Sequence, residues 1–169
     1  MTPARPCAET GSSILVLGLG NSLLSDEGVG IHALEYLRGE SGLSLVDGGT
    51  LSFSLLPLVM EAEGLMVVDA AALGLTPGAV RRFTGPRMDR FVRGGIRTAH
   101  EVGLKELLDL ARLEDRLPRR RALIGVQPAL LDWGTTLSDP VAAALPQACA
   151  LVRATARRWQ VRSAAAVPV

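Results

Sequence analysis

The chain lacks a charge excess of either sign, and it lacks any long apolar run. Its 169 residues carry 18 Lys and Arg against 17 Asp and Glu, a formal net charge of +1. Such a balance gives no overall field that would select nucleic acid or an acidic membrane. The apolar runs "SILVLGLG" and "GLMVVDAAALG" are much shorter than the roughly 20 residues that span a bilayer. We therefore expect neither a nucleic-acid-binding protein nor a membrane protein.

Cysteine is also scarce, with Cys7 near the N-terminus and Cys149 far from it. Two cysteines so far apart do not predict a disulfide framework. The N-terminal "MTPARPCAETGSS" has no apolar core of the kind that a signal peptide needs. We therefore expect a soluble, cytoplasmic protein that acts as a monomer. Its 48% apolar residues suit one compact domain over residues 13–159, with a disordered leader at 1–12 and a flexible tail at 160–169.

Short apolar runs alternate with helical patterns along that domain. Continuous apolar runs predict strands buried on both faces at 12–19, 43–48, 65–70 and 121–127. Periodic apolar positions predict helices that start near Val29, cover 104–111, and cover 137–158 with a break near Pro146. After the tight turn at 75–78, residues 79–83 are expected to return antiparallel to the strand ending at Ala70. This order predicts a three-layer α/β/α sandwich with a mixed, mostly parallel sheet of about five strands.

Carboxylates follow several of the predicted strands. "GLGNSLLSDEGVG" at 18–30 places Asp26 and Glu27 before a helix, Asp47 precedes two glycines, and Asp69 ends a run of apolar residues. The carboxyl ends of parallel strands meet at one edge of a sheet, where functional groups gather. Asp26 or Glu27 also suits a helix N-terminus, and Asp47 suits an ordinary turn. Asp69 is harder to assign to structure alone, because a buried carboxylate is costly unless it is paired or coordinating.

Several common active-site motifs are missing. The glycine-rich loop does not match a phosphate-binding G-x-G-x-x-G, because the third glycine would fall at Leu23. His100 and Glu101 do not form a zinc-protease H-E-x-x-H, because position 104 is Leu104. No G-x-S-x-G occurs, and neither cysteine lies in a recognisable nucleophile motif. The other histidine, His32, is interpreted as a surface or packing residue of the first helix.

Glu27, Asp69 and His100 remain as a possible metal site built from three separate turns. His100 opens a predicted helix, where a capping or solvent role is an alternative. Two carboxylates and one imidazole leave coordination positions open and suit zinc, nickel or iron. Spacing along the chain does not establish that the three side chains meet.

Five blocks of the sequence carry a family resemblance. They are "ILVLGLGNSLLSDEGVGIHALEYL", "LVDGGTLSFSLLPLV", "LMVVDAAALGLTPGAV", "TAHEVGLKELL" and "LIGVQPALLDWGTTLSDPVAAALP". In this order, from about residue 13 to 155, the chain resembles the nickel-iron hydrogenase maturation endopeptidases. The first block is the most specific, because G-x-G-N-x-L-x-x-D-E-G combines the turn with the acidic pair. Such proteases remove a C-terminal extension from the precursor of the hydrogenase large subunit after nickel insertion.

The resemblance implies roles for four residues. The positions that bind the metal and serve catalysis in the family match Glu27, Asp69 and His100, and the position implicated in substrate recognition matches Asp47. Asp26 is then left to serve the helix start. We infer that the nickel arrives with the precursor, so that the protease cuts only a nickel-loaded large subunit. Either the metal polarises the scissile carbonyl, or it activates a water with one carboxylate as the base.

Other interpretations stay open at this stage. A noncatalytic nickel chaperone of hydrogenase assembly would use the same three ligands, and a nucleotide-binding module would use the glycine-rich loop instead. A basic segment before His100 is either a solvated loop or a surface that steers an acidic protein. Its arginines are Arg81, Arg82, Arg87, Arg90, Arg93 and Arg97.

Overall fold

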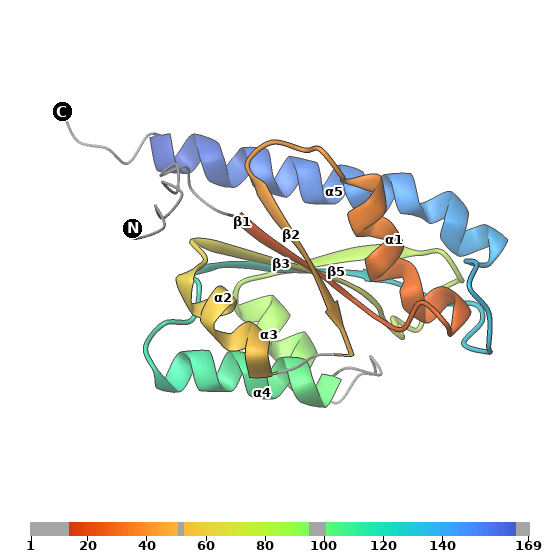
Figure 1. Ribbon diagram of the computed structural model, residues 1–169, viewed down its shortest axis with the longest axis horizontal. Coiled ribbons are helices and arrows are strands. Elements are labelled where there is room, and N and C mark those ends of the chain that lie inside the picture. The colour runs from red at the N-terminus through yellow and green to blue at the C-terminus, as the bar shows by residue number, and fades with distance from the viewer. Residues whose placement is uncertain (1–13, 51–52, 95–100, 165–169) are drawn as a thin grey trace, which may run out of the picture.

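A five-stranded sheet forms the centre of the computed structural model, which describes residues 14–50, 53–94 and 101–164 (Figure 1). Its strands are β1 (Ile14–Leu19), β2 (Leu43–Gly49), β3 (Gly64–Ala70), β4 (Val80–Thr84) and β5 (Arg120–Val126). They lie in the order β2-β1-β3-β5-β4. The first four in this order are parallel, and β4 is antiparallel to β5. The predicted mixed, mostly parallel sheet is confirmed.

Helices cover both faces of the sheet. One face carries α1 (Val29–Tyr36) and α5 (Asp139–Ala164), and the other carries α2 (Leu56–Glu61), α3 (Pro86–Arg93) and α4 (Glu101–Leu113) (Figure 1). Two short 3-10 helices, η1 (Ser25–Gly28) and η2 (Phe53–Leu55), follow β1 and β2. Alternation along a strand feeds both layers, because Val16 packs with α1 and α5 whereas Leu17 packs on the opposite side. The predicted α/β/α sandwich is therefore confirmed.

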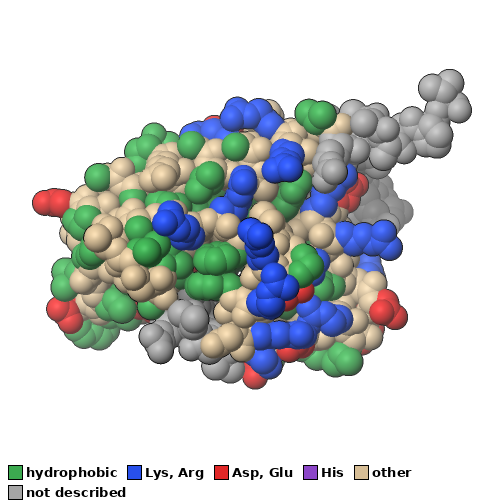
Figure 2. Space-filling model, turned by 180° about the vertical axis from the view of Figure 1, so that it is seen from behind, with side chains coloured by type: hydrophobic (Ala, Val, Ile, Leu, Met, Phe, Trp, Pro, Cys, Tyr) green, Lys and Arg blue, Asp and Glu red, His purple; other side chains and the backbone are tan. Residues whose placement is uncertain are grey.

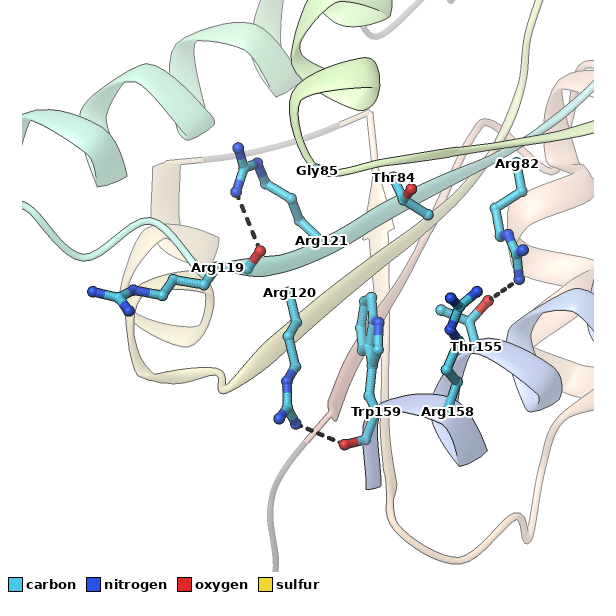
Figure 3. Close-up of a pocket in the computed structure, with 9 residues that line it drawn as sticks. All are labelled: Arg82, Thr84, Gly85, Arg119, Arg120, Arg121, Thr155, Arg158 and Trp159. Atoms are coloured by element: carbon cyan, nitrogen blue, oxygen red, sulfur yellow. Dashed lines mark hydrogen bonds between the residues drawn. The ribbon is translucent and has the colours of Figure 1, made fainter. Parts of the chain in front are cut away.

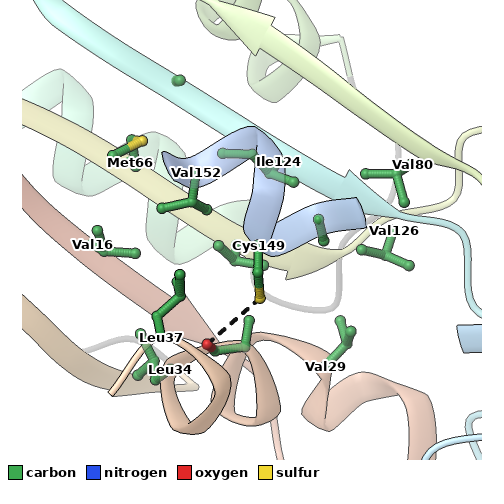
Figure 4. Close-up of a cluster of buried hydrophobic side chains, with 14 of the residues drawn as sticks. Val16, Val29, Leu34, Leu37, Met66, Val80, Ile124, Val126, Cys149 and Val152 are labelled. Carbon is green, nitrogen blue, oxygen red and sulfur yellow. Dashed lines mark hydrogen bonds between the residues drawn. The ribbon is translucent and has the colours of Figure 1, made fainter. Parts of the chain in front are cut away.

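Cys149 lies in the core between the sheet and the helices α1 and α5 (Figure 4). Its thiol is buried and donates a weak hydrogen bond to the carbonyl oxygen of Ala33 at 3.8 Å. Burial raises the pKa of the Cys149 thiol to about 11. A thiol of this kind is protonated at neutral pH and acts as a small apolar side chain rather than a nucleophile.

The position of β4 corrects the sequence prediction. Residues 79–83 were expected to return beside the strand that ends at Ala70, but β4 pairs with β5 and not with β3. The cause is the insertion of β5, which takes the free edge of β3. Gln127, just after β5, holds the crossing segment, because its Oε1 accepts hydrogen bonds from the backbone N–H of Leu73 at 2.7 Å and Leu75 at 3.4 Å.

The last helix also differs from its prediction. α5 runs without a break from Asp139 to Ala164, with Pro146 inside it, and so extends into the segment that was expected to be tail. Proline lacks an N–H and therefore removes one hydrogen bond from a helix. Both halves of α5 nevertheless bury apolar side chains against the same core, among them Val141 and Val152. This shared packing accounts for a helix that continues past Pro146.

Two helices, α2 and α3, were not foreseen. α3 starts at Pro86, directly after Gly85, whose φ of 51° turns the chain out of β4. Met88 and Val92 are buried on its inner face. A proline at the first helical position followed by apolar residues four apart was a usable indication of this helix. No helix in the described ranges combines the length and apolar character needed to cross a membrane.

Candidate metal and substrate site at the carboxyl ends of the strands

Glu27 and Asp69 both lie where parallel strands end. Asp69 is on β3 with no exposed surface, and Glu27 is on η1, directly after β1, with 7% of its surface exposed. β1 and β3 are neighbours in the sheet, and η1 contacts β3. The structure therefore brings the two predicted carboxylates to the same edge of the sheet and buries both. Each side chain also interacts with its surroundings.

Glycines permit this close arrangement. Gly20 has a φ of 138°, and a Cβ atom there would lie 1.8 Å from the carbonyl oxygen of Glu27. A Cβ atom on Gly30 would lie 2.4 Å from the carbonyl oxygen of Val68, the residue before Asp69. Side chains at these two positions would push η1 and α1 away from the strand ends. The glycines of the loop thus serve backbone contact rather than phosphate binding.

The register of β3 decides which face Asp69 occupies. Residues two apart on a strand point to the same face, so Asp69 shares the face of Val67. Val67 packs in the cluster that contains Leu104 and Leu107 of α4. Asp69 and α4 are therefore on the same side of the sheet, and α4 starts one residue after His100. His100 itself lies outside the described residues.

Within the described ranges, no three His, Cys, Asp or Glu side chains are grouped as metal ligands. The predicted triad includes His100, which lies outside these ranges. The second histidine, His32, is half-buried on α1, and its Nε2 atom is buried with no hydrogen-bond partner among the described residues. His32 was expected to be a surface or packing residue, and its half-buried position agrees with packing.

Asp26 does not serve the helix start, which corrects the sequence interpretation. No side-chain cap hydrogen bond is present at η1 or α1 among the residues described. Instead, Oδ2 of Asp26 accepts hydrogen bonds from the backbone N–H of Ala129 and Leu130 and from the Ser138 hydroxyl, each at 2.8 Å. Oδ1 accepts the backbone N–H of Ser138 at 2.7 Å. The carboxylate ties residues 129–138 to the loop that carries Glu27.

Opposing effects set the pKa of Asp26. Burial raises it, but hydrogen bonds from the backbone and hydroxyl of Ser138 and from the backbone of Leu130 and Ala129 lower it more. The net result is a pKa below the ordinary value for Asp. These donors stabilise the ionised form and offset the cost of burying a charge.

Backbone contacts strengthen the same junction. The N–H of Ser25 donates to the carbonyl of Gly134 at 2.8 Å, and the N–H of Gly134 donates to the carbonyl of Leu23 at 3.0 Å. Both of these hydrogen-bonded loops carry exposed apolar side chains. The largest is Trp133, which is 81% exposed. The others are Leu23, Leu130 and Leu131. We call these four residues the apolar rim.

Asp47 is exposed near the end of β2, the strand on the other side of β1. Its Cα is in register with Gly18 of β1, and its Oδ1 accepts the backbone N–H of Gly49 at 2.8 Å. The Asp47 side chain therefore stabilises the turn that follows it, as expected for an ordinary turn residue. It also lies at the same edge of the sheet as Glu27 and Asp69.

The basic segment before His100 is divided between several contacts. Arg82 donates to Thr155 of α5 at 3.0 Å, and Arg93 pairs with Asp109 of α4 at 2.7 Å. Arg81, Arg87 and Arg90 are exposed, whereas Arg97 lies outside the described residues. Two of these arginines thus make contacts within the protein, and steering of an acidic partner stays a prediction.

Comparison with known proteins places the chain in a family. Residues 31–155 match the model of the hydrogenase maturation protease family. The chain is 40% identical over 152 residues to hydrogenase expression/formation protein HupM of Azotobacter chroococcum, covering 86% of this chain and 73% of that protein.

Solved structures agree with this match. The hydrogenase maturating endopeptidase HybD of Escherichia coli superposes with a TM-score of 0.80 at 29% identity, covering 86% of this chain and 93% of that one. The maturation protease HybD of Thermococcus kodakarensis gives a TM-score of 0.75 at 33% identity, covering 85% of this chain and 99% of that one. The nucleotide-binding and chaperone alternatives are not favoured by these relatives. The chain belongs to the hydrogenase maturation proteases.

Proposed function

We propose that this protease cleaves the C-terminal extension from a nickel-iron hydrogenase large-subunit precursor after nickel insertion, and that Glu27, Asp69 and His100 hold the nickel of the precursor. The observation that carries the proposal is the burial of Glu27 and Asp69 at the ends of two neighbouring strands. Buried carboxylate oxygens together with an imidazole suit a divalent transition metal.

The face occupied by Asp69 supports the third ligand. α4 packs on that face, and His100 immediately precedes it in the sequence. A nickel ion held there belongs to the substrate, so its absence from an immature precursor would remove the main contact. This dependence would make the protease act after metal insertion and not before.

Hydrolysis needs a water and a place for its proton. In this proposal, Glu27 and Asp69 hold the nickel of the precursor, and one of these carboxylates accepts the proton of the attacking water. The metal contributes Lewis acidity towards the scissile carbonyl or the water. The products are the mature subunit with a new C-terminal carboxylate and the released extension.

The surroundings of this site suit a protein substrate. Asp47 is exposed at the same edge and is proposed to contact the precursor. The apolar rim lies on loops hydrogen-bonded to the residues just before Glu27, and we assign the body of the precursor to it. Exposed Trp and Leu side chains close to a reactive centre are typical of protein contact surfaces. A cytoplasmic location and a monomeric state stay predictions.

The test is incubation with purified large-subunit precursor, with and without nickel, followed by intact mass of the products. Wild-type protein should shorten only the loaded precursor. Glu27→Gln, Asp69→Asn and His100→Ala should each abolish shortening, while Glu114→Gln and Asp115→Asn should behave as wild type. Glu114 and Asp115 are exposed and precede β5, away from the carboxyl ends of the parallel strands. Their substitutions make the same chemical changes as Glu27→Gln and Asp69→Asn.

Three outcomes would contradict the proposal. Equal cleavage of nickel-free and nickel-loaded precursor would remove the metal from recognition. Normal processing by Asp69→Asn would place the site elsewhere. Tight binding of the loaded precursor by wild-type protein without any shortening would identify a nickel-binding chaperone instead.

A further inference from the structure

A second concave site lies at the opposite end of the sheet from Asp69. It is a pocket of about 270 Å³ between the end of β4, the start of β5 and the last part of α5 (Figure 3). The parallel strands start at this end, because Arg120 is the first residue of β5 and pairs in register with Gly64, the first residue of β3. The pocket is therefore separate from the candidate nickel site and from the apolar rim.

Arginine dominates the lining of this pocket. Five of its lining residues are arginines, and no Asp or Glu is among the described residues that line it. The five are Arg82, Arg119, Arg120, Arg121 and Arg158. The guanidinium groups of Arg82, Arg120 and Arg158 lie on the α5 side of the sheet, whereas the side chains of Arg119 and Arg121 point away from Trp159 (Figure 3). Figure 2, turned by 180° from the view of Figure 1, shows Lys and Arg side chains gathered over one part of that face with few acidic side chains between them.

One of these charges is neutralised from outside the pocket. Arg121 donates to both carboxylate oxygens of Asp89 on α3, at 2.7 and 2.6 Å. Oδ2 of Asp89 also lies 3.2 Å from Nη2 of Arg112, so the charge of Asp89 is shared between two arginines. Arg82, Arg120 and Arg158 remain as the guanidinium groups on the α5 side of the pocket. A concentration of like charge of this kind favours a bound anion.

Two guanidinium groups are held in place by hydrogen bonds. Arg82 Nη1 donates to Oγ1 of Thr155 at 3.0 Å, and Thr155 in turn donates to the carbonyl of Leu151 at 2.7 Å. Arg120 Nη1 donates to the carbonyl of Trp159 at 2.8 Å (Figure 3). Such bonds fix the orientation of these two guanidinium groups, each of which carries five N–H donors.

Trp159 supplies a firm apolar wall. A Cβ atom at Gly64 would lie 2.7 Å from Cε3 of its indole, so the ring rests directly on the start of β3. The ring is half-buried and lines the pocket beside Arg158 (Figure 3). A ligand in the pocket therefore meets an arginine cluster together with a fixed aromatic surface.

We propose that this pocket binds a small oxyanion with two or more negative charges, of the size of pyrophosphate or citrate. Arginine matches phosphate and carboxylate oxygens through paired N–H donors, which give the strongest kind of hydrogen bond in proteins. The pocket volume is slightly below the range of drug-sized ligands, which begins near 300 Å³. The site does not depend on the proposed nickel recognition.

The experiment is calorimetric titration of the full chain with sodium pyrophosphate, sodium citrate and inorganic phosphate at low and high KCl. Pyrophosphate or citrate should bind saturably, more tightly than phosphate, and more weakly at high salt. Arg158→Gln and Arg82→Gln should each weaken binding about tenfold, the effect of losing one charged hydrogen-bonding group. Both side chains are exposed, so neither change should unfold the protein.

Matched controls are available beside each variant. Arg157→Gln on the same helix as Arg158 and Arg81→Gln on the same strand as Arg82 remove the same charge from exposed residues that do not line the pocket. They should change the dissociation constant less than about twofold, as expected for a long-range charge effect. Equal weakening by the control variants and the pocket variants would overturn the proposal, because it would show only non-specific attraction.

Fluorescence locates the ligand independently. The chain has two tryptophans, so Trp133→Phe leaves Trp159 as the sole source of indole emission. Its emission should change with pyrophosphate and saturate at the concentration found by calorimetry. No saturation by any of the three anions below about 1 mM, or saturation without a change in Trp159 emission, would refute an oxyanion site here.

Discussion

Asp26→Asn should destabilise the protein strongly, although asparagine has nearly the same shape as aspartate. The carboxylate has no exposed surface and accepts four hydrogen bonds. Asparagine retains one oxygen, which is able to keep the three bonds now made by Oδ2. Its amide nitrogen would then face the backbone N–H of Ser138, so one bond is lost and two donors oppose each other.

The loss is estimated from these contacts. A hydrogen bond to a charged group contributes about 1.5–3 kcal/mol, and the three that remain become neutral and weaker, so the free energy of unfolding should fall by about 3 kcal/mol. For a chain of this length such a loss lowers the melting temperature by roughly 6–12 °C. If Asp26 were a helix cap, asparagine would replace it with almost no change, because both residues are good caps.

The pH dependence follows from the direction of the pKa shift. The pKa of Asp26 is lowered in the folded protein, so its carboxylate adds stability above the unfolded value of about 3.9. This contribution is lost as the pH falls through the lower folded pKa. The difference between wild type and Asp26→Asn should therefore be largest at neutral pH and should shrink below about pH 4.

Urea unfolding followed by far-ultraviolet circular dichroism measures the effect. Asp132→Asn is the matched control, because Asp132 is exposed on the segment that Asp26 anchors. It should change the free energy of unfolding by less than about 0.5 kcal/mol. The reasoning is refuted if Asp26→Asn is as stable as Asp132→Asn at pH 7.

Three further predictions concern other parts of the chain. Gly20→Ala should lower the free energy of unfolding by about 3 kcal/mol or more, because its Cβ atom would lie 1.8 Å from a backbone oxygen. Gly39→Ala, at a φ of 87° with open space around it, should lower it by about 1 kcal/mol, and equal urea midpoints for the two variants would contradict this. Trp133→Ala should leave unfolding unchanged, since the ring is 81% exposed, but should raise the KM for loaded precursor about fivefold, and an unchanged KM would remove the apolar rim from docking. The hydrogen bond from Arg121 lowers the pKa of Asp89, so Asp89→Asn should lower the free energy of unfolding by about 2 kcal/mol at pH 7 and by less below pH 4. A loss of stability that does not depend on pH would argue against the ion pair.

Most of the sheet was predictable because four of its five strands are short, continuous apolar runs. The segment that ends at Asp69 is buried on both faces, so its composition alone indicated a central parallel strand. The order of the strands was harder to predict. β4 was expected to pair with β3, because β3 is the strand before it in the sequence. No local pattern indicates that β5, which comes later in the chain, lies between them. α5 was expected to break at Pro146, because sequence rules weigh a local hydrogen bond and not the packing of both halves on one core.

The candidate site divides in the same way. The positions after strands predicted that Asp26, Glu27, Asp47 and Asp69 gather at one edge of the sheet, since the carboxyl ends of parallel strands share an edge. The family resemblance, and not the spacing, assigned site roles to Glu27 and Asp47. The role of Asp26 was not accessible from sequence, because its four donors lie more than one hundred residues away. Ser138 carries no motif that would have indicated them.

Local apolar patterns and short motifs were enough to predict the layer architecture, the family and the edge of the sheet where the carboxylates gather. That Asp26 anchors a loop, while Glu27 and Asp69 lie buried at the candidate site, is visible only in the folded chain. The tertiary structure also decided that Arg82, Arg120 and Arg158 share one pocket, although they come from three separate elements. Such contacts depend on strand order and helix packing, which bring distant residues together in ways that no local pattern specifies.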